Sequence, residues 1–104
     1  MTRPRILVVD DEENLRRVTQ LRLEQAGYEV QTAADGPSAL AMLPRFRPEL
    51  VMTDLRMPGM SGLDLLRRVK AEAPEVIVIV FTAFGTIESR SEEHTSELQS
   101  RQSI

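Results

Sequence analysis

The chain has 104 residues, which is enough for one domain. Its composition, 41% hydrophobic and 28% charged, is that of a globular protein, and its net charge of −3 gives no basic surface for nucleic acid or an anionic membrane. There is no cysteine, which excludes disulfides and thiolate metal sites. The apolar run at residues 6–9 is too short for a secretory signal and meets four acidic residues. We expect a soluble, cytoplasmic domain that binds neither nucleic acid nor a membrane.

The first third of the chain predicts strand, helix and strand. Residues 5–10 form a short apolar run, which is typical of a strand covered on both faces of a parallel sheet. Residues 12–26 predict a helix with acidic residues in its first turn, and Gly27 stands where such a helix ends. The broad apolar face of this helix comprises Leu15, Val18, Leu21 and Ala26. Residues 28–33 alternate between polar and apolar and predict a second strand.

The remaining elements continue the alternation. Residues 35–43 predict a helix, with Pro37 suited to its first position. Residues 49–54 read as a buried strand that ends on an acid. A serine and an aspartate three positions apart resemble a capping box and open a third helix over residues 61–73. Residues 76–83 are the most strand-like segment of the chain.

This order, β-α-β-α-β-α-β with short connections, predicts right-handed crossovers and a parallel sheet. The expected fold class is therefore α/β, a doubly wound parallel sheet. In such sheets ligands bind beyond the carboxyl ends of the strands, so the residues that follow each strand are the first candidates for function.

Acidic residues occupy those positions. Asp10 and Asp11 follow the first strand, Asp54 ends the third, and Thr82 lies at the end of the fourth. Three carboxylates at one edge of a sheet would repel one another and raise one another's pKa. A single aspartate after a strand is most often a helix cap, but three at one edge favour a divalent cation, and an all-oxygen site favours Mg²⁺.

Four segments carry a resemblance to a known family. "ILVVDDEENLR", "DGPSAL", "ELVMTDLRMPGMSGLDLL" and "VIVFTAFGT" resemble, in order and spacing, the CheY-like receiver domain of bacterial response regulators over residues 4–89. "TAFGTIES" resembles the receivers of sigma-54-dependent transcriptional regulators. The resemblance implies a flavodoxin-like fold. It also implies a module of a two-component phosphorelay that takes a phosphoryl group from a sensor histidine kinase and regulates an output, transcription above all.

The resemblance also implies roles for individual residues. Asp54 corresponds to the phosphoacceptor, and Thr82 to the hydroxyl residue that hydrogen-bonds the phosphoryl group. Asp10 and Asp11, with Asp54 and the backbone carbonyl of Arg56, correspond to the Mg²⁺ ligands. Such a module phosphorylates itself and does not turn over an external substrate. An ATPase and a DNA-binding region are the candidate output domains of the intact gene, and the sequence leaves open whether they follow. We interpret Arg16 and Arg17 as a solvated helix face.

Part of the family pattern is missing. A receiver has a fifth strand that ends in a lysine, and a fifth helix, but this sequence has no lysine after Lys70. We therefore expect strand order 2-1-3-4 with the fifth strand and helix missing, and we expect the strand over residues 76–81 to be an unpaired, apolar edge. Such a chain should bind Mg²⁺ weakly and hold a phosphoryl group poorly.

The end of the chain has a different character. We expect residues 1–89 to form an incomplete receiver domain and residues 90–104 to be a disordered, non-native tail, because this segment offers no apolar face to bury. "RSEEHTSELQS", residues 90–100, resembles the conceptual translation of a short-read sequencing adapter. Our hypothesis is that family sequence continues after about Ser89 in the intact gene.

Two other functions are alternatives to a receiver for an α/β chain of this kind. A Mg²⁺-dependent phosphatase of the haloacid-dehalogenase type would have a D-x-D-G-T pattern, which neither "DDEEN" nor "DLRMP" provides. A flavin- or nucleotide-binding fold would need a glycine-rich or hydroxyl-rich phosphate loop after the first strand, where acids stand instead. Turnover of a generic phosphomonoester would distinguish the phosphatase from a receiver.

Overall fold

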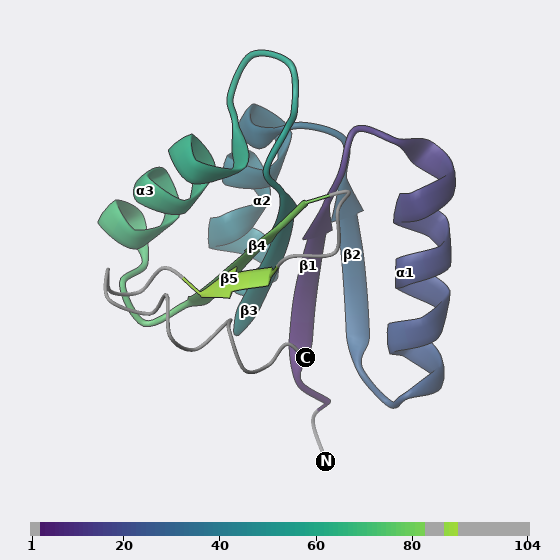
Figure 1. Cartoon of the computed structure of the whole chain (residues 1–104). Helices are drawn as coiled ribbons and strands as arrows, with labels where there is room; N and C mark the ends of the chain where they lie inside the picture. Colours follow the sequence, from purple (N-terminus) through teal and green to yellow (C-terminus); the bar gives the residue numbers. More distant parts are fainter. Residues whose placement is uncertain (1–2, 83–86, 90–104) are drawn as a thin grey trace.

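The computed structural model describes residues 3–82 and 87–89 as one β-sheet with helices on both faces (Figure 1). In chain order the elements are β1 (Arg5–Val9), α1 (Glu13–Gln25), β2 (Glu29–Ala33), α2 (Gly36–Phe46), β3 (Leu50–Asp54), α3 (Gly62–Glu72), β4 (Ile77–Phe81) and β5 (Ile87–Ser89). Within the described residues, no helix is long and apolar enough to cross a membrane. The segment 90–104, predicted to be a tail, lies outside the described residues.

Local side-chain chemistry sets the helix ends. Glu12 caps α1 by accepting the Leu15 amide, and Asp35 caps α2 by accepting the Ser38 amide. Ser61 and Asp64 form a reciprocal capping box at the start of α3, as the sequence predicts. These caps therefore fix the residue at which each helix starts.

The sheet confirms the expected parallel topology. Its strand order is β2-β1-β3-β4-β5, and the first four strands are parallel. The carboxyl ends of β1, β3 and β4 consequently lie at one edge of the sheet, with Val9 beside Thr53 and Asp54 beside Phe81 in the register. This arrangement is the flavodoxin-like order 2-1-3-4 that the family resemblance implied.

The expectation that β4 is an unpaired edge is wrong. The parallel strands of the described residues keep the expected order 2-1-3-4, without the parallel fifth strand of the family pattern. The three-residue strand β5 pairs with β4 and is antiparallel to it, with Phe81 opposite Ile87 and Ile79 opposite Ser89. An antiparallel neighbour can follow β4 after a short connection, whereas a parallel one requires a long crossover. β5 therefore differs in direction from the four parallel strands and covers only the second half of β4.

The two faces of the sheet are packed differently. α2 and α3 lie together on one face, where they enclose the larger hydrophobic core (Figure 1). That core contains Leu7, Val9, Val51, Val78 and Val80 of the sheet with Leu43, Leu65 and Val69 of the helices. α1 lies on the other face, against β1 and β2, over a smaller cluster of Ile6, Val8 and Val30.

The predicted apolar face of α1 does not form a core contact. No residue of α1 is buried, and Leu15, Val18 and Leu21 are 51%, 48% and 55% exposed. The half-buried residues of α1 are Arg16, Thr19, Gln20 and Leu23. α1 thus turns a largely polar side toward the sheet and leaves its apolar stripe accessible, because the described residues supply no element to cover it.

Candidate metal centre

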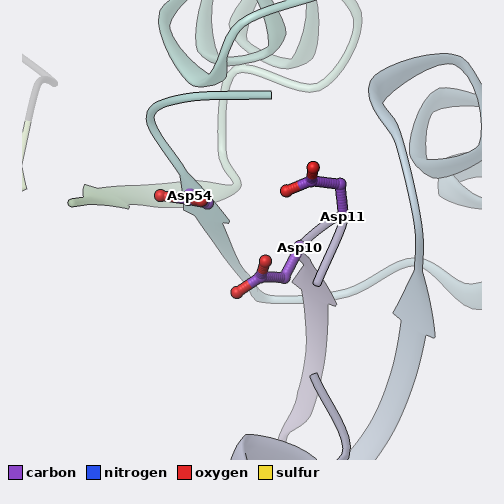
Figure 2. Close-up of side chains that lie close together, drawn as sticks. All are labelled: Asp10, Asp11 and Asp54. Atoms are coloured by element: carbon purple, nitrogen blue, oxygen red, sulfur yellow. The ribbon is translucent and has the colours of Figure 1, made fainter. Parts of the chain in front are cut away.

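Three aspartates converge where the strands end. Figure 2 shows Asp10 and Asp11 at the end of β1 and Asp54 at the end of β3. One carboxylate oxygen from each residue lies within 4.8 Å of the others. The prediction that these side chains gather at one edge of the sheet is confirmed, and it follows from the parallel arrangement of β1 and β3.

Asp10 is the buried member of the group, at 2% exposure. Its Oδ1 accepts the Glu12 backbone amide at 2.9 Å, and its own amide donates to the Ala33 carbonyl at 3.1 Å. Burial is the main cause that raises the pKa of Asp10, the Glu12 amide partly opposes this rise, and the charges of Asp54 and Asp11 add to it. The sequence suggested repulsion among the carboxylates as the cause of a raised pKa. For Asp10 this repulsion contributes less than burial does.

The backbone around Asp54 is held from both sides. The amide of Leu55 donates to the Phe81 carbonyl at 2.7 Å, and the amide of Gly62 donates to the Leu55 carbonyl at 2.9 Å. A Cβ atom on Gly62 would collide with the Asp54 carbonyl oxygen and would lie 2.9 Å from the Leu55 Cα. Glycine at this position therefore lets α3 start directly against the phosphoacceptor candidate.

Arg16 departs from its prediction as a solvated side chain. It is half-buried, and its Nη1 donates to the Asp10 carbonyl oxygen at 2.7 Å. The sequence contains a signal for this contact, since an arginine in the second turn of a helix can reach back to the turn that precedes the helix. That signal is weak, because Arg17 is the next residue of the same helix turn and yet is exposed.

The other two predicted site residues lie in the connections at the same edge. Arg56 is exposed and lies two residues beyond Asp54, in the loop between β3 and α3. Thr82 is half-buried and directly follows Phe81, the register partner of Asp54. Their roles toward a cation or a phosphoryl group stay predictions.

The donor set fits a hard divalent cation. All three side chains are carboxylates, and Mg²⁺ prefers oxygen ligands. One carboxylate oxygen from each residue lies within 4.8 Å of the others, which is close enough for the three to share one cation after they move inward. The glutamate next to them, Glu12, is already used as the cap of α1.

A family model described as the response regulator receiver domain matches residues 6–99. The chain belongs to this family. The receiver is 41% identical over 85 residues to the probable transcriptional regulatory protein TcrX of Mycobacterium tuberculosis, covering 82% of this chain and 36% of TcrX. It is 35% identical over 88 residues to sporulation initiation phosphotransferase F of Bacillus subtilis, covering 85% of this chain and 71% of that protein.

Solved structures of similar receivers share the fold. The response regulator protein TrrA of Thermotoga maritima, in complex with Mg²⁺ and BeF, is 36% identical with a TM-score of 0.73 and covers 93% of this chain and 78% of TrrA. CheY4 of Vibrio cholerae gives a TM-score of 0.76 at 27% identity. The receiver spans about a third of the length of TcrX.

Proposed function

We propose that this receiver accepts a phosphoryl group on Asp54, with Mg²⁺ held by Asp10, Asp11, Asp54 and the backbone carbonyl of Arg56. The observation that carries the proposal is the convergence of the three carboxylates at the carboxyl edge of the sheet. The binding of Mg²⁺ and BeF by TrrA, which has the same fold, supports it by similarity.

The donor in this proposal is a phosphohistidine of a sensor kinase. A carboxylate oxygen of Asp54 forms a bond to phosphorus while the P–N bond breaks, and the imidazole nitrogen leaves with the electron pair and takes up a proton. The product is an aspartyl phosphate, and Thr82 is proposed to donate its hydroxyl hydrogen to a phosphoryl oxygen. When bound, Mg²⁺ supplies positive charge that lets the anionic carboxylate approach the anionic phosphoryl group.

The burial of the two aspartates supports Asp54 as the nucleophile and Asp10 as a metal ligand. Asp54 is half-buried and open to a donor, whereas Asp10 is almost fully buried and has one oxygen engaged by the Glu12 amide. The less accessible carboxylate thus suits a ligand, and the more accessible one suits a nucleophile. The receiver would act as a switch for an output, with transcription favoured by relatives such as TcrX.

The sequence also bears on the lifetime of the product. The family places a lysine at the end of a fifth strand, and no lysine follows Lys70 here. One cationic partner of the phosphoryl group is therefore lacking. We expect the 104-residue chain to take up a phosphoryl group and to lose it quickly.

The test is incubation of the whole chain with a small phosphodonor such as acetyl phosphate, followed by rapid acid quenching and intact-mass spectrometry. We expect one added phosphoryl group, only in the presence of Mg²⁺. The matched controls are Asp54→Asn, which should abolish labelling, and Glu49→Gln, a change of equal charge at the opposite edge of the sheet, which should not.

Two results would overturn the proposal. One is labelling that persists in Asp54→Asn at the wild-type level. The other is Mg²⁺-dependent turnover of p-nitrophenyl phosphate, since an enzyme of the phosphatase class would release phosphate repeatedly, whereas a receiver modifies only itself.

A further inference from the structure

Arg16 connects α1 to the turn that carries two of the three acids. Its Nη1 donates to the carbonyl oxygen of Asp10 at 2.7 Å, across the connection between β1 and α1. The guanidinium is half-buried, and a hydrogen bond from a charged donor is stronger than one between neutral groups. The contact therefore acts on the backbone of the site and leaves the carboxylates free to bind a ligand.

We propose that Arg16 is a positioning residue that holds the β1–α1 turn so that Asp10 and Asp11 face Asp54. The inference rests on the proposed function, because it assigns Arg16 a part in the same site. With Arg16 in place, three bonds fix Asp10: its amide to Ala33, its Oδ1 to the Glu12 amide, and its carbonyl to Arg16.

The weak packing of α1 makes this bond important. A helix with a buried face is located by its core contacts, but α1 has no buried residue and contributes the half-buried Leu23 to the smaller cluster. Its position relative to the end of β1 must then depend more on polar contacts, of which the Arg16 bond is the shortest described. Loss of the bond would let the turn, and Asp11 with it, sample other orientations.

Charge and position make opposite predictions for Mg²⁺ binding. Removing a cation near an acidic cluster should strengthen the binding of Mg²⁺ through electrostatics alone. Loss of a group that orients the ligands should weaken it, typically by about 10- to 100-fold. A weaker affinity in an uncharged Arg16 variant can therefore be assigned to positioning.

The experiment measures the Mg²⁺ dissociation constant of the whole chain by isothermal titration calorimetry. The variants are Arg16→Met, Arg16→Lys and, as the matched control, Arg17→Met. We expect the affinity of Arg16→Met to fall about tenfold or more, that of Arg16→Lys to fall less, and that of Arg17→Met to stay at or slightly above the wild-type value.

A second measurement follows amide hydrogen exchange of Glu12, whose N–H binds Oδ1 of Asp10, in metal-free protein. Faster exchange in Arg16→Met than in Arg17→Met supports the inference, and equal exchange with unchanged affinity overturns it. If the wild-type chain binds no Mg²⁺, the proposed function fails, and hydrogen exchange alone decides the role of Arg16. If Arg16→Met does not fold, the same comparisons with Arg16→Lys decide it.

Discussion

The two faces of the sheet differ in how completely they are packed. On one face, α2 and α3 bury Ala39, Leu43, Leu65, Leu66 and Val69 against the strands. On the other face, α1 buries no residue, and Ile77 of β4 is 57% exposed. Among the described residues, the first face is a closed core, whereas the second is open over much of its area.

The candidate site draws on both faces. Asp54 is fixed from the closed face, where Gly62 starts α3 against its backbone. Asp10 and Asp11 lead into α1 on the open face, where polar bonds add to a small hydrophobic cluster. The nucleophile candidate and the candidate metal ligands are thus held by different means, and mutations should separate the two.

The largest effect on stability should come from shortening a buried side chain on the closed face. Leu65 is fully buried, so Leu65→Ala should lower the free energy of unfolding by about 2–5 kcal/mol. Leu21→Ala removes the same atoms from an exposed position of α1 and should cost less than about 1 kcal/mol. Urea denaturation of both variants measures the difference, and equal losses would contradict the description of α1 as unpacked.

The next effect concerns the backbone behind Asp54. Gly62→Ala should lower the free energy of unfolding by about 1–3 kcal/mol, because the added methyl group meets main-chain atoms of Asp54 and Leu55. Gly36→Ala is the control, since the atoms nearest to its added methyl group belong to the Met60 side chain, with the flexible Sδ closest. Chemical denaturation should show the larger loss of stability for Gly62→Ala. A larger loss for Gly36→Ala would contradict the close packing of Gly62 against the backbone of Asp54.

A smaller effect is expected at the start of α3. Ser61→Ala removes one half of the capping box and should cost about 1 kcal/mol of stability. Arg67→Ala breaks only the exposed ion pair with Asp64 in the same turn and should cost less than about 0.5 kcal/mol. Thermal unfolding of the two variants checks this order, and the reverse order would mean that the charge pair holds the helix end.

The smallest effect is a pH dependence on the open face. Because the pKa of Asp10 is raised above its usual 3.8, mainly by burial, the folded chain binds this proton more tightly than the unfolded chain does. Its contribution to stability is therefore greatest below that usual value and falls as the pH rises through the raised pKa. Asp10→Asn keeps the Oδ1 acceptor for the Glu12 amide and should flatten this fall in metal-free protein.

The check is the urea midpoint measured from acidic to neutral pH with a chelator present. Asp11→Asn, at an exposed position, serves as the control. At neutral pH the Asp10→Asn chain should be more stable than the wild type. If the urea midpoint of Asp10→Asn declined with pH as steeply as that of the wild type, the charge of Asp10 would not be a source of the pH dependence.

Much of this architecture could be predicted from the sequence because local signals and topology agree. The apolar run before Asp10, the acid at Asp54 and the cap at Ser61 each determine a local element. Parallel strands then bring the two acidic positions to one edge without any knowledge of long-range contacts. The three carboxylates of the candidate site follow from that argument.

The misses share one physical cause. Helical periodicity reveals the apolar stripe that includes Val18, but only a tertiary partner decides whether the stripe is buried. The contact of Arg16 with Asp10 and the pairing of β5 with β4 likewise depend on neighbours that periodicity does not describe. Sequence reasoning therefore predicted the elements and the residues at the strand ends, and it failed where burial or pairing depends on a distant neighbour.

The most direct test of the central claim is a Mg²⁺ titration of the isotope-labelled chain followed by amide NMR. If Asp10, Asp11 and Asp54 form one cation site, saturable shift changes should gather at residues 10–12 and 54–56, and they should vanish in Asp54→Asn. Saturating Mg²⁺ that leaves these amides unmoved, or shifts that survive in Asp54→Asn, would contradict the account.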